Sequence, residues 1–300
     1  TYSLLMIPYL AMPAEMTQSY HGRTQLMSMR VLFSSMGSSI GLTGGPWLLH
    51  QWGATRAGHS SMALVIAGVA AVTTVLCVWL IRDAPRTARP AGATPGLLVQ
   101  LRSALSNRPF VWLLVAKCLY FVTLAFTLTT FAYFTKHVLK TSDAWLGAFL
   151  LAQSLSVVLS QPLWLRVARR FGKQRGFMLA GACYGLAYFS WWFAGLDEPL
   201  PLIFARAIAI GVAGGGTFLL TQAMLPDAIE YDHPRTGLRR EGVFTGVFVF
   251  VEQAAGAIGV AIIGFVLSAT GYVATTEGRL VAQPQSAIQG IYFCMAILPL

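Results

Sequence analysis

The stretch GVFTGVFVFVEQAAGAIGVAIIGFVLSAT, residues 242–270, decides the fold class of this chain. Its only charged residue is Glu252. A membrane helix needs about 20 mostly apolar residues, whereas a membrane β-strand needs about 10 of alternating polarity. Because lipid cannot satisfy free backbone groups, unbroken apolarity over this length predicts a transmembrane helix.

Similar stretches recur along the whole sequence. The chain is 56% hydrophobic and 11% charged, whereas soluble domains carry about 25% charged residues. We therefore expect an all-α, polytopic membrane bundle of nine spans, the first and last cut short in a fragment of a longer protein. The other eight expected spans are Thr1–Ala14, Thr24–His50, Ser60–Ile81, Pro109–Thr135, Ala144–Leu165, Phe177–Gly195, Pro201–Pro226 and Ser286–Leu300.

The basic residues lie mainly in alternate loops. Numbered in order, the odd loops and their flanks hold 15 of the 21 Lys and Arg, the even loops hold 4, and Lys117 and Arg206 lie within spans. Cytoplasmic loops of membrane proteins are rich in Lys and Arg, so the odd loops are predicted to be cytoplasmic. This asymmetry explains the net charge of +10 without a nucleic-acid partner.

An internal repeat suggests two bundles of six helices. His21-Gly22-Arg23-Thr24 and His233-Pro234-Arg235-Thr236 each follow one span and precede the next, and a linker rich in Pro and Gly lies between them. Two parallel halves of six helices are typical of the major facilitator architecture. The expected units are residues 1–81 (helices 4–6), the cytoplasmic linker 82–108, and residues 109–300 (helices 7–12). Three helices would precede Thr1.

The segment PDAIEYDHPRTGLRREG, residues 226–242, resembles the glycoside–pentoside–hexuronide:cation symporter family, whose best-known member is the melibiose carrier. The family pattern is an Asp, an acidic residue followed by Tyr, then Thr-Gly-x-Arg and an acidic residue followed by Gly. Ile7–Thr17 and Asn107–Phe110 are also similar to this family. The resemblance implies a major facilitator fold and symport of a solute with Na⁺ or H⁺.

The resemblance also suggests individual site residues. Ser3 matches the family's fourth-helix hydroxyl near the cation site, and Arg30 matches its fifth-helix arginine. Other positions depart from the melibiose carrier, so its specificity is not expected here. The departing positions are Met6, Leu10, Phe248, Val249 and Gln253.

Two charged residues deep in spans are the main candidates for solute binding and coupling. Glu252 lies about 15 Å along its helix and Lys117 about 12 Å along another, counted from the cytoplasmic side. A charge at such depth marks a functional site by default. We hypothesise that the two residues pair across a central cavity and that cation binding at Glu252 releases the pair. The alternatives are helix packing for Glu252 and an interfacial position for the Lys117 amine.

The polar neighbours of these charges form the rest of the expected site. Tyr120, Gln222 and Gln253 are expected to join Arg30 in binding the solute. A charged cluster at the cytoplasmic helix ends is interpreted as a gate, or otherwise as a solvated loop. The gate residues are Asp227, Glu230, Asp232, Arg239, Arg240 and Glu241.

The sequence thus predicts a multi-pass transporter of the cytoplasmic membrane. It carries no P-loop and no hydrolase motif, so neither an enzyme nor ATP-driven transport is expected. No cofactor is expected besides the coupling ion, and the protein is expected to be a monomer in the lipid bilayer. Two alternatives stay open: a carrier of an amphipathic or lipid-like solute, and a membrane sensor that does not transport.

Overall fold

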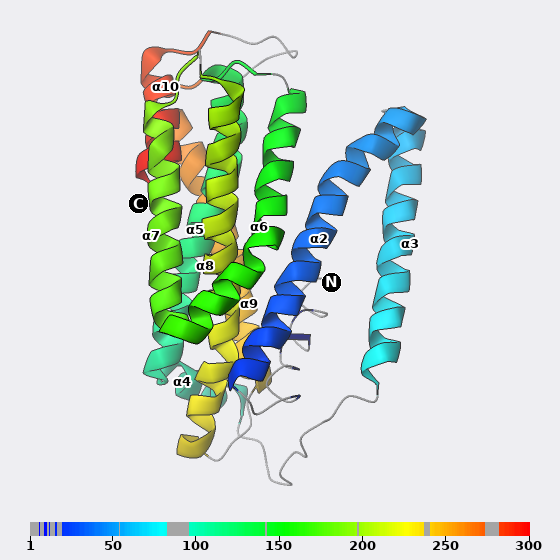
Figure 1. The fold of residues 1–300 in the computed structure, drawn as a ribbon, viewed down its shortest axis with the longest axis vertical. Coiled ribbons are helices and arrows are strands. Elements are labelled where there is room, and N and C mark those ends of the chain that lie inside the picture. The colour runs from blue at the N-terminus through cyan, green and yellow to red at the C-terminus, as the bar shows by residue number, and fades with distance from the viewer. Residues whose placement is uncertain are drawn as a thin grey trace.

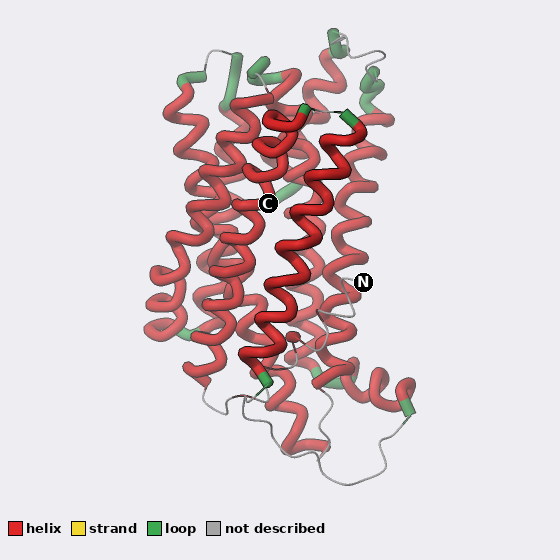
Figure 2. Tube along the Cα trace, turned by 90° about the vertical axis from the view of Figure 1, so that its right-hand side faces the viewer, coloured by secondary structure: helices red, strands yellow, loops and turns green. Residues whose placement is uncertain are grey.

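The computed structural model describes residues 6, 9, 10, 12, 16, 20–53, 55–82, 96–141, 143–196, 198–236, 241–273 and 282–300. Within these ranges every regular element is helical (Figures 1 and 2). The elements are α2 (Tyr20–Trp52), α3 (Arg56–Ile81), α4 (Leu97–Leu105), α5 (Arg108–His137), α6 (Asp143–Phe171), α7 (Lys173–Phe189), the 3₁₀ turn η1 (Ser190–Phe193), α8 (Leu200–Thr236), α9 (Glu241–Ala269), α10 (Gln285–Tyr292) and the π-helical turn η2 (Phe293–Ile297).

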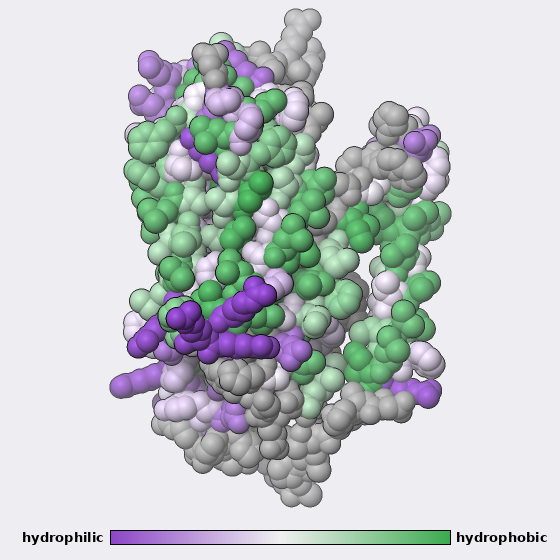
Figure 3. Space-filling model, viewed as in Figure 1, coloured by the Kyte–Doolittle hydropathy of each residue, from purple (hydrophilic) through white to green (hydrophobic). Residues whose placement is uncertain are grey.

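The surface of the bundle is apolar over most of its height. Figure 3 shows hydrophobic side chains covering the middle of the molecule, with a hydrophilic cluster towards the end that carries α4. Five described helices, namely α3, α5, α6, α8 and α9, are long and apolar enough to cross a membrane. On α3, large apolar side chains such as Leu64 and Val75 are exposed. Water cannot cover such a surface at low cost, so this is an integral membrane protein.

Local sequence signals explain where two of these helices begin. The Asn107 side chain accepts a hydrogen bond from the backbone N–H of Phe110, and Pro109 occupies the first turn of α5. The Thr55 hydroxyl caps α3 in the same way by accepting from Gly58. The last part of the linker forms the short helix α4, which packs against α5 and α9.

Helix α8 continues ten residues past the predicted end of its span. Pro226 was expected to begin a loop, but α8 ends only at Thr236. Ala228 and Ile229 are buried in a cluster with Phe110 and Leu113 of α5, and this packing holds the added turns in place. The first half of the predicted cytoplasmic motif is therefore helical.

Helices α5 to α9, here called the second bundle, pack closely in two layers. α9 packs along α5, while α8 packs between α6 and α7 (Figure 1). Glycines allow these close approaches: a Cβ at Gly211 would meet the backbone of Gln153, and one at Gly259 would meet the backbone of Val122. This packing fixes the distance between the helices that carry the central charges.

The first turns of helix α2 pack against the other helices. Met27, Ser28 and Val31 are buried, and Val31 packs with Trp164 of α6. Further along α2, Ile40 is exposed, and Figure 1 shows α2 diverging from α6 towards the far end. The described contacts of α2 with the other helices therefore lie towards the linker side. The division into residues 1–81, 82–108 and 109–300 remains a prediction.

Candidate functional site

Lys117 and Glu252 form an ion pair between α5 and α9. The Lys117 Nζ lies 2.8 Å from the Glu252 Oε2, with the lysine side chain fully buried and the carboxylate 15% exposed. The two helices run in the same direction, so the residues reach similar depths at about 1.5 Å per residue. The pairing predicted from the sequence is confirmed, and the lysine amine does not reach the interface. The cavity that the pair was expected to span remains a prediction.

Aromatic rings surround the amine. The Lys117 Nζ lies 3.1 Å from the centroid of the Phe248 ring and 5.2 Å from that of Phe121. An ammonium over an aromatic face is stabilised by the ring quadrupole, and more strongly where water is excluded. Phe248, one of the departures from the melibiose carrier, therefore contributes to holding the charge.

Arg30 approaches this pair from α2. Its guanidinium lies 5.5 Å from the centre of the Tyr9 ring, and its charge interacts with that of Lys117. Arg30 lies in the helix that rests on the second bundle, so the cluster draws residues from both parts of the chain.

The other expected solute contacts differ in their surroundings. The Tyr120 hydroxyl donates to the Gly214 carbonyl at 3.3 Å and its ring packs near Tyr184, so it belongs to the core of the second bundle. Gln222 is buried, and among the described residues its amide oxygen accepts no hydrogen bond. Gln253 is exposed beside Glu252. Ser3 lies outside the described residues.

The expected gate residues are spread over several environments. Asp227 pairs with Lys173 at 2.6 Å, and Lys173 also donates to the Ala223 carbonyl at 3.1 Å. This pair joins α7 to α8 within one bundle. Glu230 is exposed, Asp232 is buried, and Glu241 is the first residue of α9, where it complements the helix dipole. Arg239 and Arg240 lie outside the described residues.

Two polar groups of the second bundle were missed at the sequence level. Arg206 pairs with Glu198, and its guanidinium lies 5.2 Å from the ring centre of Trp191. Glu198 precedes the start of α8, so no helical spacing relates it to Arg206.

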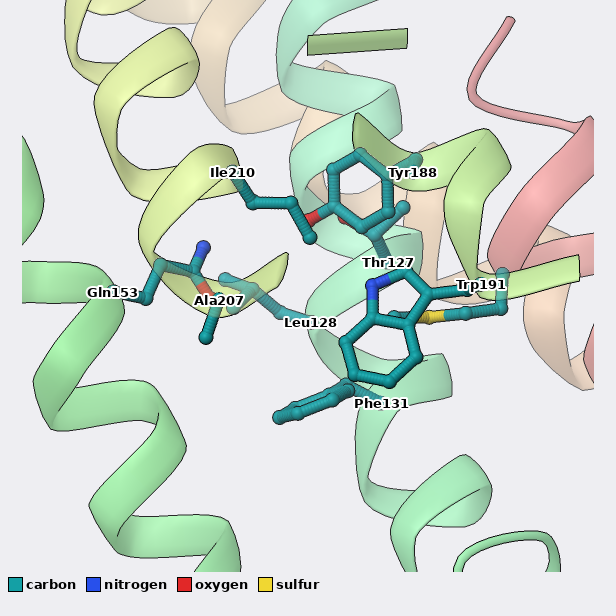
Figure 4. Close-up of a pocket in the computed structure, with 9 residues that line it drawn as sticks. Thr127, Leu128, Phe131, Gln153, Tyr188, Trp191, Ala207 and Ile210 are labelled. Atoms are coloured by element: carbon teal, nitrogen blue, oxygen red, sulfur yellow. The ribbon is translucent and has the colours of Figure 1, made fainter. Parts of the chain in front are cut away.

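A narrow pocket near Trp191 has room for about one water molecule and is lined by Thr127, Gln153, Tyr188 and Trp191, among others (Figure 4).

A wide groove also opens at the linker-side end of the bundle. It lies between the first turns of α5 and α7 and the last part of α8, with Arg108, Trp112 and Tyr231 among its lining. Neither Lys117 nor Glu252 lines it. Neither this groove nor the narrow pocket therefore contains the central pair.

Comparison with known proteins assigns the family. The family model of the MFS/sugar transport proteins matches residues 1–300. This chain belongs to that family. The chain is similar to the glucuronide carrier protein homolog of Escherichia coli, 28% identical over 99% of this chain and 64% of the relative. The isoprimeverose transporter of Lactiplantibacillus pentosus is 25% identical over 99% of the chain and 62% of the relative.

A lipid carrier is also among the relatives of this MFS/sugar transport protein. The sodium-dependent lysophosphatidylcholine symporter 1-A of Danio rerio is 29% identical over 57% of this chain and 32% of the relative. The chain thus spans less than two thirds of the length of these three relatives. The resemblance to glycoside–cation symporters is confirmed, and the family is one of transporters.

Proposed function

We propose that the full-length protein is a secondary active transporter that couples the entry of a sugar or glycoside to Na⁺ or H⁺ by alternating access. The observation that carries this proposal is the buried Lys117–Glu252 pair in a chain of the sugar transport family. Relatives named for glucuronide and isoprimeverose transport support the solute class. No cofactor besides the coupling cation is needed.

The pair supplies a simple means of coupling. While Glu252 is ionised, it neutralises Lys117. A proton or Na⁺ on the carboxylate weakens that attraction and frees the amine for the solute. Breaking a buried ion pair is costly unless another group replaces the lost partner. Cation and solute would therefore bind together rather than singly, which is what symport requires.

The remaining residues take supporting roles in this proposal. Arg30 and Gln222 would contact the solute beside Lys117, with Gln253 and Tyr120 at the edge of the site. Ser3 would contribute to the cation site. The change of access would open one side of the membrane to the site while the other side closes. The gate would include Glu230, Asp232, Arg239, Arg240 and Glu241. Asp227 was also expected there, but it pairs with Lys173 between α7 and α8 and would instead stabilise that packing.

A second candidate function is transport of an amphipathic solute. The apolar residues at Met6, Phe248 and Val249 favour it, as does the relative named for lysophosphatidylcholine transport. The sugar proposal has broader support because the glycoside relatives align along nearly the whole chain. The two solute classes predict different competitors for uptake.

Uptake by reconstituted vesicles tests the proposal. Labelled sugars and glycosides would be offered to the full-length protein with an imposed Na⁺ gradient, an imposed proton gradient, or none. The proposal predicts accumulation of at least one sugar above its external concentration under one of the gradients. Accumulation of lysophospholipids alone would favour the second candidate. No accumulation of any solute would favour a membrane sensor.

A further inference from the structure

The indole of Trp191 is a buried donor that finds no acceptor among the described residues. Its side chain is fully buried, and its Nε1 makes no hydrogen bond within that part of the chain. Buried polar groups are nearly always hydrogen-bonded, because an unpaired donor lowers stability. By contrast, the buried indole of Trp164 donates to the Val212 carbonyl at 2.7 Å. Trp191 therefore needs an acceptor of another kind.

The narrow pocket beside Trp191 has room for such an acceptor. Figure 4 shows Trp191 and Gln153 on opposite sides of this pocket, with the indole nitrogen turned towards it. The space open to a water-sized sphere is about 10 Å³, which is close to the least that one water molecule needs. A sugar or a lipid chain is too large for this space.

The pocket also presents the two to four polar partners that a buried water needs. Gln153 of α6 carries an amide that can both donate and accept. The Thr127 hydroxyl of α5 donates to the Thr123 carbonyl at 2.7 Å, so the lone pairs of its oxygen can accept. The Tyr188 hydroxyl of α7 interacts with the side chains of Thr127 and Gln153. Donors and acceptors from three helices thus meet at this point.

The chemistry of the lining favours water over a metal ion. The Trp191 N–H can only donate, and the Arg206 guanidinium lies 5.2 Å from the centre of the same ring. Both groups oppose the binding of a cation, so the pocket does not suit the coupling ion. A water molecule can accept from the indole and donate to an oxygen of Thr127 or Gln153.

We propose that this pocket binds one structural water molecule, which accepts a hydrogen bond from Trp191 and donates to side chains of α5 and α6. Trp191 lies in η1, the 3₁₀ turn that follows the end of α7. The water therefore fixes the end of α7 to its two neighbours. The proposal does not depend on which solute or ion is transported.

Removing only the N–H of Trp191 tests this proposal. In the full-length protein, 3-benzothienylalanine in place of Trp191 keeps the size of the ring system but has sulfur where the indole has N–H. With water in the pocket, the loss of one hydrogen bond lowers the melting temperature by about 1–3 °C. A melting temperature that is unchanged or raised would show that the N–H had no acceptor, and it would overturn the proposal.

The same replacement at Trp164 is the matched control. Trp164 donates directly to the Val212 carbonyl, so its analogue loses a hydrogen bond whether or not the pocket holds water. The drop in melting temperature at position 164 gives the size of the effect expected at position 191.

X-ray radiolytic labelling provides a second test that needs no variant, so it decides if the analogue at position 191 fails to fold. Irradiation produces hydroxyl radicals from bound water, and these oxidise the side chains beside it. The proposal predicts that Trp191 in the folded full-length protein is oxidised several-fold faster than Trp164, although both are buried. Equal or slower oxidation of Trp191 would contradict it.

Discussion

At the residue scale, the two described ion pairs of Lys117 and Lys173 differ in what they connect. Lys117–Glu252 joins α5 to α9 at the centre of the molecule, whereas Lys173–Asp227 joins neighbouring helices α7 and α8 at the linker side. The second pair is 2.6 Å long, and its lysine is almost fully buried. We therefore expect the first pair to affect coupling and the second to affect stability.

Substitutions at the second pair test this division. Asp227→Asn should lower the free energy of unfolding by about 3 kcal/mol because it leaves a buried cation without its carboxylate. The double variant with Lys173→Gln should recover part of the loss. Thermal unfolding in detergent measures the change. Unchanged stability with a large loss of uptake per folded molecule would instead assign Asp227 to the gate.

Gly216 illustrates a residue whose small size is required. A Cβ at this position would overlap the ring of Trp164, whose indole N–H donates to the Val212 carbonyl at 2.7 Å. Gly216→Ala should therefore destabilise the protein by about 1–3 kcal/mol. Gly256→Ala on α9 is the matched control because nothing lies within 4 Å of its Cβ. Similar melting temperatures for the two variants would contradict this account.

At the element scale, one side chain fixes both the start of α5 and its contact with α8. Asn107 accepts from the Phe110 N–H at 3.2 Å and donates to the Ala228 carbonyl at 3.1 Å, and it is buried. The cap sets where α5 begins, and so it sets the depth of Lys117. The bond to Ala228 supports the extra turns of α8 beyond Pro226.

Variants at Asn107 separate these two contributions. Asn107→Ala should cost about 1–2 kcal/mol of stability because both bonds are lost. Asn107→Asp keeps the oxygen that caps α5 but removes the amide donor, so it should retain the cap while losing the contact with Ala228. Thermal unfolding of both variants gives the comparison. A melting temperature unchanged by Asn107→Ala would show that neither bond contributes.

The sequence predicted elements better than it predicted contacts. Apolar runs located the described spans, and depth along parallel helices was enough to pair Lys117 with Glu252. The end of α8 was wrong because the burial of Ala228 and Ile229 against α5 is a tertiary contact. The Arg206–Glu198 pair was missed for another reason: Glu198 precedes α8, so no helical spacing relates it to Arg206.

At the scale of the whole molecule, the packing of α2 suggests how access could alternate. The described contacts of α2 with α6 and α8 bury its first turns, while its later side chains are exposed. Arg30 lies between Ser28 and Val31 in this contact region, and its charge acts on that of Lys117. A change in the charge of the pair would thus act at the surface that must separate when the linker side opens.

The central claim is that Glu252 couples cation entry to solute entry. Its most direct test compares gradient-driven accumulation with solute exchange in vesicles containing the full-length protein, unmodified or with Glu252→Gln. The account predicts that the variant still exchanges labelled for unlabelled solute but no longer accumulates it under a Na⁺ or proton gradient. Accumulation by Glu252→Gln equal to that of the unmodified protein would contradict the claim.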